Sequence, residues 1–256
     1  MNLSNRSIFA LILACGLALG TAQAATLTVT TPVDALNPEN QPVDSTITLV
    51  TLENQIRISV WNDIVDPKSS GQNISAIQFG VSGGIVTGIT GSSGTQRYIT
   101  EPDEWEDNGP VATEWAFDFS DSTVTLSALD GDDAARASHT IVGSPNSSNR
   151  YEKANGSIIA KNNGNGKNGH NPFLAGEVTF VLAATGISEQ TQITEATVFY
   201  GTEAFAAPVE FDVPEVPNSS AVPAPSAVMV GGMLLIGLLG RRSVKARKRF
   251  AFDASR

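Results

Sequence analysis

The sequence predicts an all-β fold, an antiparallel β-sandwich, for the long stretch between its two ends. Many short runs rich in Val, Ile, Thr and Phe are separated there by Gly, Asn, Asp and Pro, which is typical of strands joined by turns. No part of that stretch keeps an apolar period of 3.6 residues over the length of a helix. About ten short strands in about 195 residues favour a jelly-roll-like or immunoglobulin-like sandwich.

Apolar and polar residues alternate in several of these runs, most clearly in Gln55–Trp61, Ile74–Val81 and Glu177–Ala183. In the first run, Ile56 and Val60 fall on the same face of the strand. Such one-faced strands belong to antiparallel sheets that bury one side and expose the other. The expected strands are Thr26–Thr30, Thr46–Leu52, Gln55–Trp61, Ile74–Val81, Ile85–Ile89, Thr113–Phe119, Thr123–Leu126, Ser157–Ala160, Glu177–Ala183, Ile193–Tyr200 and Val209–Val213.

Two polar segments are expected to be loops of this domain, which we place at residues 25–207. Glu101–Pro110 contains five acidic residues and Trp105, the candidate ligand contact because an exposed indole ring can stack on a sugar. Trp115 lies in an apolar run and is expected in the core. The segment from Gly143 to Gly169 is rich in Ser, Asn and Gly, and its low apolar content predicts a surface loop. A Pro-rich linker is expected at residues 208–220.

The predicted exported part is strongly acidic. It holds eight basic and 25 acidic residues, a difference of −17. Such a domain repels nucleic acid and anionic membrane surfaces, so neither is an expected partner. A structural Ca²⁺ is the one cofactor considered, because Asp130–Asp133 and Asp103–Asn108 each gather oxygen ligands. Neither segment has EF-hand spacing, and no metal site is assigned.

Residues typical of catalysis are sparse, and no catalytic residue is assigned. The one cysteine, Cys15, lies near the N-terminus, so the domain is expected to form no disulfide and no thiolate nucleophile. His139 and His170 show no zinc spacing, and no serine stands in a Gly-x-Ser-x-Gly motif. The carboxylates of Glu104, Glu106 and Asp118 leave a glycoside hydrolase open as an alternative.

Residues 1–24 have the three parts of a secretory signal peptide. Arg6 supplies the positive charge and Ile8–Leu19 the apolar run. The small residues Ala22 and Ala24 mark a cleavage site that makes Ala25 the first residue of the mature chain. Two alternatives are an uncleaved anchor and lipidation at Cys15, against which the large Leu13 argues.

The C-terminal residues 221–250 also have three parts. Val222, Pro223, Ala224 and Pro225 begin a short motif at 222–226, and residues 227–240 form an apolar segment expected to be a transmembrane helix. Its fourteen residues fall short of the ~20 that span a bilayer comfortably, which suits a temporary stop. The cluster at 241–249 is expected to stay on the cytoplasmic side. Its basic residues are Arg241, Arg242, Lys245, Arg247, Lys248 and Arg249.

This tail resembles the PEP-CTERM sorting signal, whose motif is usually Val-Pro-Glu-Pro. Here Val222, Pro223 and Pro225 match, and Ala224 replaces the glutamate. The resemblance implies an exosortase partner that removes the tail, a transient stay in the inner membrane, and a final place at the cell surface or in the matrix. It also implies association with exopolysaccharide or biofilm. An ordinary single-pass anchor is the alternative.

The sequence therefore predicts a non-catalytic exported surface or matrix protein. A secreted carbohydrate-active enzyme with a sandwich fold and a filament subunit that pairs through an edge strand are the alternatives kept open.

Overall fold

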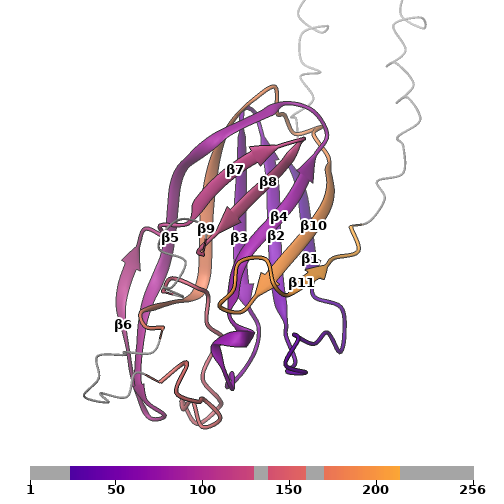
Figure 1. The fold of residues 1–256 in the computed structure, drawn as a ribbon. Helices are drawn as coiled ribbons and strands as arrows, with labels where there is room; N and C mark the ends of the chain where they lie inside the picture. Colours follow the sequence, from indigo (N-terminus) through magenta and orange to yellow (C-terminus); the bar gives the residue numbers. More distant parts are fainter. Residues whose placement is uncertain (1–23, 130–137, 160–169, 214–256) are drawn as a thin grey trace, which may run out of the picture. The chain divides into compact units, whose positions relative to one another are not determined.

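The structure is a computed structural model that describes residues 24–129, 138–159 and 170–213. These residues form two antiparallel sheets and, among them, no α-helix; a single 3₁₀ turn, η2 (Ser70–Gln72), precedes β4 (Figure 1). The six-stranded sheet runs β1-β2-β3-β9-β5-β6 and the five-stranded sheet β11-β10-β4-β8-β7. Strand bounds are β1 (Ala25–Thr30), β2 (Ser45–Leu52), β3 (Gln55–Asn62), β4 (Ile74–Val81), β5 (Ile85–Glu101), β6 (Glu104–Val111), β7 (Ala116–Ser120), β8 (Thr123–Ser127), β9 (Phe173–Thr185), β10 (Ile193–Tyr200) and β11 (Pro208–Glu210).

The alternation in the sequence becomes the alternation of burial in the sheets. Along β3, Ile56, Ile58 and Val60 are buried while Arg57 is exposed. Ile58 pairs with Phe180 of the neighbouring β9, so the apolar face continues from β3 to β9. The all-β prediction is confirmed for the described residues.

The apolar faces of the two sheets share one hydrophobic core. The rings of Trp115, just before β7, and Phe180 in β9 lie 5.2 Å apart, and the Trp115 indole donates a hydrogen bond of 2.8 Å to the carbonyl of His139. Tyr200 of the second sheet donates a hydrogen bond of 2.8 Å to Ser45 of the first. Trp115 is 5% exposed, so its predicted place in the core is confirmed.

Three predictions about local structure are wrong. The acidic segment Glu101–Pro110 is not a loop, because Glu104–Val111 form β6 and pair with β5. The strand expected at Ile85–Ile89 continues to Glu101, with register shifts against β9 at Gly88 and Gly91. The second half of this strand has glycines and polar residues and therefore no apolar alternation. It pairs with a strand on each side but buries little of either face. The described residues of the strand expected at Ser157–Ala160 form a turn instead.

A second hydrophobic cluster lies under the β5–β6 hairpin. It corrects the prediction for the polar segment that begins at Gly143, because Tyr151, Ile158 and Ile159 are buried there. The few apolar residues of this segment form a cluster because they pack against residues of β5 and β9. The buried members of the cluster are Ile99, Val142, Tyr151, Ile158, Ile159, Phe173 and Ala175.

The ends of the described sandwich lie close to the predicted processing boundaries. The first strand begins at Ala25, the expected first residue of the mature chain. Pro208–Glu210 fall within the predicted linker and overlap the strand expected at Val209–Val213. They form the edge strand β11 beside β10, and Phe211 is buried. Residues 1–23 of the signal peptide, Asp130–Asp133 and the whole sorting tail lie outside the described residues. In the part of the chain that the structure describes, no helix is long and apolar enough to cross a membrane.

Candidate functional site

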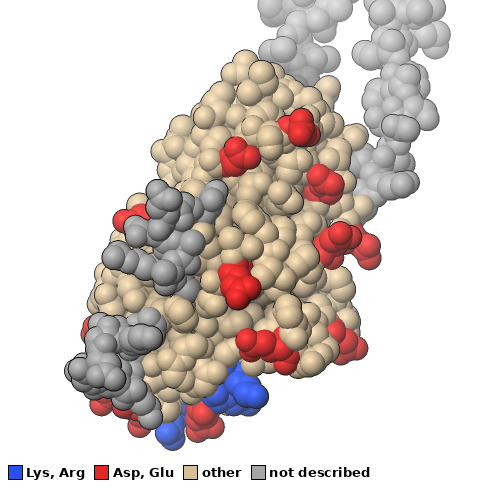
Figure 2. Space-filling view, in the orientation of Figure 1, with Lys and Arg blue, Asp and Glu red and all other residues tan. Residues whose placement is uncertain are grey.

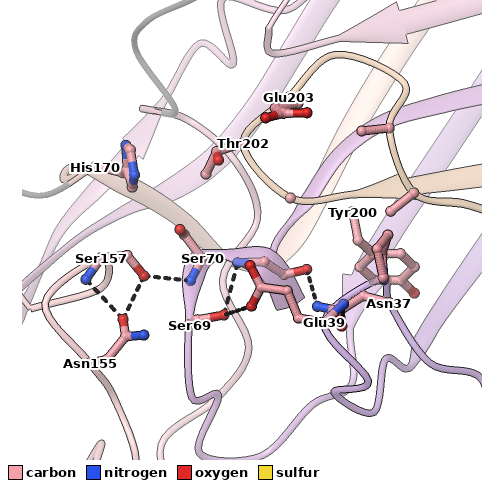
Figure 3. A pocket seen from close by; sticks show the side chains of 15 residues that line it. Asn37, Glu39, Ser69, Ser70, Asn155, Ser157, His170, Tyr200, Thr202 and Glu203 are labelled. Atoms are coloured by element: carbon pink, nitrogen blue, oxygen red, sulfur yellow. Dashed lines mark hydrogen bonds between the residues drawn. The ribbon is translucent and has the colours of Figure 1, made fainter.

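A polar cavity of about 410 Å³ lies among the loops at one end of the sandwich (Figure 3). Its volume is within the range of small-molecule pockets. Five separate segments of the chain meet there, including η2 and the loop between β10 and β11. The lining residues are Asn37, Pro38, Glu39, Ser69, Ser70, Gly71, Asn155, Ser157, His170, Tyr200, Gly201, Thr202, Glu203, Ala206 and Ala207.

Asn37 holds the first of these loops in place. Its side-chain oxygen accepts hydrogen bonds from the backbone N–H groups of Glu39 (3.0 Å) and Gln41 (2.9 Å). Its amide nitrogen donates to the carbonyl of Gly71, at 2.9 Å, and so ties this loop to η2. An Asn side chain that closes a turn of its own backbone is a common stabiliser of polar loops. This wall of the cavity is therefore built before any ligand arrives.

Serine hydroxyls join η2 to the segment on its other side. Ser157 accepts a hydrogen bond of 2.9 Å from the backbone N–H of Ser70 and donates one of 2.6 Å to Asn155. Ser69 caps η2 by accepting from the N–H of Gly71, and it donates to the side chain of Gln41 at 2.7 Å. The polar rim is thus a connected network, which favours a fixed shape over a collapsible loop end.

The hydroxyl of Ser70 is the group in the cavity that best indicates ligand binding. Ser70 is only 4% exposed, yet its hydroxyl has no hydrogen-bond partner among the described residues. In Figure 3 this hydroxyl points into the hollow, toward Thr202, whose own hydroxyl also has no partner in the described residues. The hydroxyl oxygen itself is reached from the hollow, because Asn73 Oδ1 is the one buried side-chain oxygen or nitrogen without a partner in the described residues. These two groups are ready to bind a ligand or water.

The cavity carries negative and no positive charge from the described residues. Glu39 and Glu203 line it and are exposed, and no Lys or Arg is among its described lining residues. Burial lowers the pKa of His170, which favours its neutral form. Burial raises the pKa of Tyr200 to about 12, so the phenol stays protonated and bonds inward to Ser45.

The charge of the cavity matches its surroundings. On the face drawn in Figure 2, acidic side chains are spread over the sandwich and the basic ones gather at its lower end. Lys68 and Lys153 line a second hollow of about 250 Å³, where Lys153 lies 3.9 Å from the buried carboxylate of Asp66.

Trp105, the candidate ligand contact of the sequence analysis, lies elsewhere. It is half-buried in β6, and its indole N–H donates to the carbonyl of Asn149 at 3.1 Å. The guanidinium of Arg97 lies 4.2 Å from the centre of its ring, and Tyr151 meets it edge-on at 6.3 Å. Much of the ring surface that a sugar would need is therefore occupied by the protein itself.

The structure does not bring the predicted carboxylates together in the cavity. Glu104 and Glu106 lie on β6, Asp118 lies on β7 of the other sheet, and none of the three lines it. In the described ranges, no three His, Asp or Glu side chains are grouped so that they could hold a metal ion. Of the predicted processing residues, only Ala24 and Ala25 are described; the sorting motif and basic cluster are not.

Sequence reasoning noted His170 but missed the rest of the cavity. Ser70, Thr202 and Glu203 stand in short polar stretches that look like ordinary turns. No spacing rule links them, because they meet only when both sheets have formed. An unusual density of Ser and Asn in several loops was the one available signal.

Comparison with protein-family models finds no match, and comparisons with curated proteins and with solved structures find no significant similarity. The function is therefore inferred from the cavity and from the two ends of the chain.

Proposed function

We propose that this chain is a non-catalytic, exported surface or matrix protein that binds extracellular polysaccharide through the polar cavity. A preformed hollow edged by hydroxyl, amide and carboxylate groups suits a polyhydroxylated ligand, because every sugar hydroxyl both donates and accepts hydrogen bonds. The observation that carries the proposal is the hydroxyl of Ser70, a residue that is only 4% exposed: it has no partner among the described residues and points into that hollow. The finer fold class proposed is a jelly-roll-like or immunoglobulin-like sandwich.

The two ends of the sequence support export and sorting. The expected signal peptide stops where β1 starts, at Ala25, so its removal would leave the first strand whole. The PEP-CTERM-like tail at 221–250 would hold the precursor in the inner membrane until an exosortase-type enzyme cuts near Val222–Pro225. The domain would then reach the cell surface or the matrix.

Retention of the exported protein on immobilised polysaccharides tests the binding proposal. We expect retention on at least one neutral or amino-sugar polymer and weaker retention of Ser70→Ala. The matched control is Ser120→Ala, on exposed strand β7, which should bind like the parent protein. Absence of retention on every polymer would sink the proposal.

Intact mass of the cell-associated and released protein tests the sorting proposal. We expect a chain that begins at Ala25 and lacks the tail after the Val222–Pro225 region. A cytosolic protein that is full length to Arg256 would contradict it.

A secreted carbohydrate-active enzyme remains the second candidate, because Glu39 and Glu203 line the same cavity. Two carboxylates about 5–9.5 Å apart across a sugar are the arrangement that glycoside hydrolysis uses. This candidate predicts turnover of the polymer that the protein retains, and loss of that turnover in Glu39→Gln and in Glu203→Gln. Binding without release of any product would remove it.

A further inference from the structure

The carboxylates of the cavity have no cationic partner among the described residues. The ion pairs of the described residues include neither Glu39 nor Glu203. Glu39 makes one weak contact, at 3.5 Å from the hydroxyl of Ser69. Their charges are thus available to a ligand that enters from solvent.

The two carboxylates come from different parts of the chain. Glu39 follows the turn that Asn37 closes, and Glu203 lies in the loop between β10 and β11. In Figure 3, Glu203 and Thr202 lie on one side of the hollow, and Glu39 and Ser70 lie on the other. A ligand in the hollow would therefore meet carboxylate and hydroxyl groups on both sides.

The neighbouring hollow shows the opposite chemistry. Lys68 and Lys153 line it, and the buried Asp66 accepts a hydrogen bond of 3.0 Å from the backbone N–H of Lys153. Basic groups therefore lie near the polar cavity but outside its lining. Anionic sugars such as uronates would meet repulsion from Glu39 and Glu203, and no Lys or Arg of the described lining offsets it.

We infer that the polar cavity selects amino sugars: the carboxylates of Glu39 and Glu203, on opposite sides of the hollow, each bind a protonated amine of a hexosamine oligomer, while Ser70 and Thr202 bind its hydroxyls. This inference rests on the proposed polysaccharide binding and names its ligand class. A protonated amine can form charge-assisted hydrogen bonds with the two carboxylates. The sugar hydroxyls can pair with the hydroxyls of Ser70 and Thr202 as donors and acceptors. Because both carboxylates are exposed, each contributes only modestly, and selectivity comes from their sum.

Calorimetric titration of the exported protein with three probes tests the inference. The probes are a glucosamine oligosaccharide, its N-acetylated counterpart of equal length, and a galacturonate oligosaccharide, at a pH where the amine is protonated. We expect the glucosamine oligomer to bind tightest and the galacturonate weakest. Glu203→Gln should weaken glucosamine binding about two- to fivefold and leave the acetylated oligomer unchanged.

Matched variants separate a specific contact from the overall charge. Glu177→Gln removes the same charge from an exposed position of β9 that does not line the cavity. We expect it to bind all three probes like the parent protein. Ser70→Ala should weaken both the amino and the acetylated oligomer.

The outcomes distinguish the two proposals. Equal affinity for the amino and acetylated oligomers would overturn the amine inference and leave polysaccharide binding standing. Equal effects of Glu177→Gln and Glu203→Gln would overturn it too, because they would show a diffuse charge effect. If none of the three probes bound while the protein was retained on another polymer, the amine inference would be wrong and polysaccharide binding would still stand.

Discussion

The two hydrophobic clusters of this protein are built by different means. The main core lies between the sheets and consists largely of strand residues such as Ile58, Phe79 and Phe180. The second cluster draws Tyr151, Ile158 and Val142 from a segment outside the strands, and packs them against Ile99 of β5 and Phe173 of β9. Burial of continuous strand faces suffices for the first. The second is smaller, and polar contacts add to the burial of its side chains.

Polar contacts centred on Arg97 complete the second cluster. Arg97 forms a two-pronged ion pair with Asp107, at 2.7 and 2.8 Å, and donates to the hydroxyl of Tyr151 at 2.9 Å. Tyr151 in turn donates to the carbonyl of Gly143 at 2.9 Å. Two-pronged pairs of this kind fix geometry as well as adding energy. Arg97 thus connects the acidic hairpin to the Ser- and Asn-rich segment.

The difference matters because the cavity depends on both regions. Tyr200 and η2 belong to the sandwich, whereas Asn155 and Ser157 immediately precede the buried Ile158 of the second cluster. One wall of the cavity is therefore supported by a large core and another by a small, polar-assisted one. Loss of the second cluster should damage the cavity while the sandwich stays folded.

The largest effect is expected in the main core. Phe180→Ala removes a fully buried ring that packs on Trp115, and should lower the free energy of unfolding by about 3–5 kcal/mol. Chemical denaturation followed by tryptophan fluorescence measures it. Val33→Ala, at a side chain that is 92% exposed, is the control and should change stability by less than about 0.5 kcal/mol. A small loss in Phe180→Ala would mean that the sheets do not share one core.

A smaller and local effect is expected in the second cluster. Tyr151→Phe keeps the ring but leaves the Gly143 carbonyl and one Arg97 donor without their partner, which costs about 1–3 kcal/mol. Hydrogen exchange should accelerate in residues 143–159 and stay slow in β3 and β4. Tyr98→Phe, on the same hairpin, is the control. Uniform acceleration through all strands would show that the two clusters unfold as one unit.

The ion pair of the hairpin should contribute less again. The side chain of Asp107 is 36% exposed, so Asp107→Asn should cost about 0.2–1 kcal/mol, and the cost should shrink at high salt because exposed charges are screened. Denaturation at low and high salt measures it, with Asp103→Asn as a control for net charge. A salt-independent loss would point to the hydrogen-bond geometry rather than to the charge.

The smallest effect is the pH dependence that His170 contributes. Burial lowers its pKa in the folded state below the ordinary 6.5. The unfolded chain then binds more protons between the folded value and 6.5, so stability should rise with pH through that window and level off above it. His170→Asn should flatten this part of the stability profile. An unchanged slope in His170→Asn would contradict the burial of this ring.

The sequence predicted most strands because alternation is a local property. Ile74–Val81 and Ile193–Tyr200 appear in the structure with the predicted bounds. The strand β6 (Glu104–Val111) was not predicted because its exposed, charged residues lack that alternation. It forms because it pairs with the neighbouring β5. The burial of Tyr151 was not predicted either, because the residues of β5 and β9 that pack on it are remote in sequence.

The β class, the acidic charge and the two ends from which we propose export can be read from the sequence, because each depends on composition or on residues close together. That five separate segments surround one cavity, and that the hydroxyl of Ser70 has no partner there among the described residues, follows from the packing of the two sheets. The sequence of a turn does not indicate which other segments it will contact, because the packing of the sheets that it connects decides them.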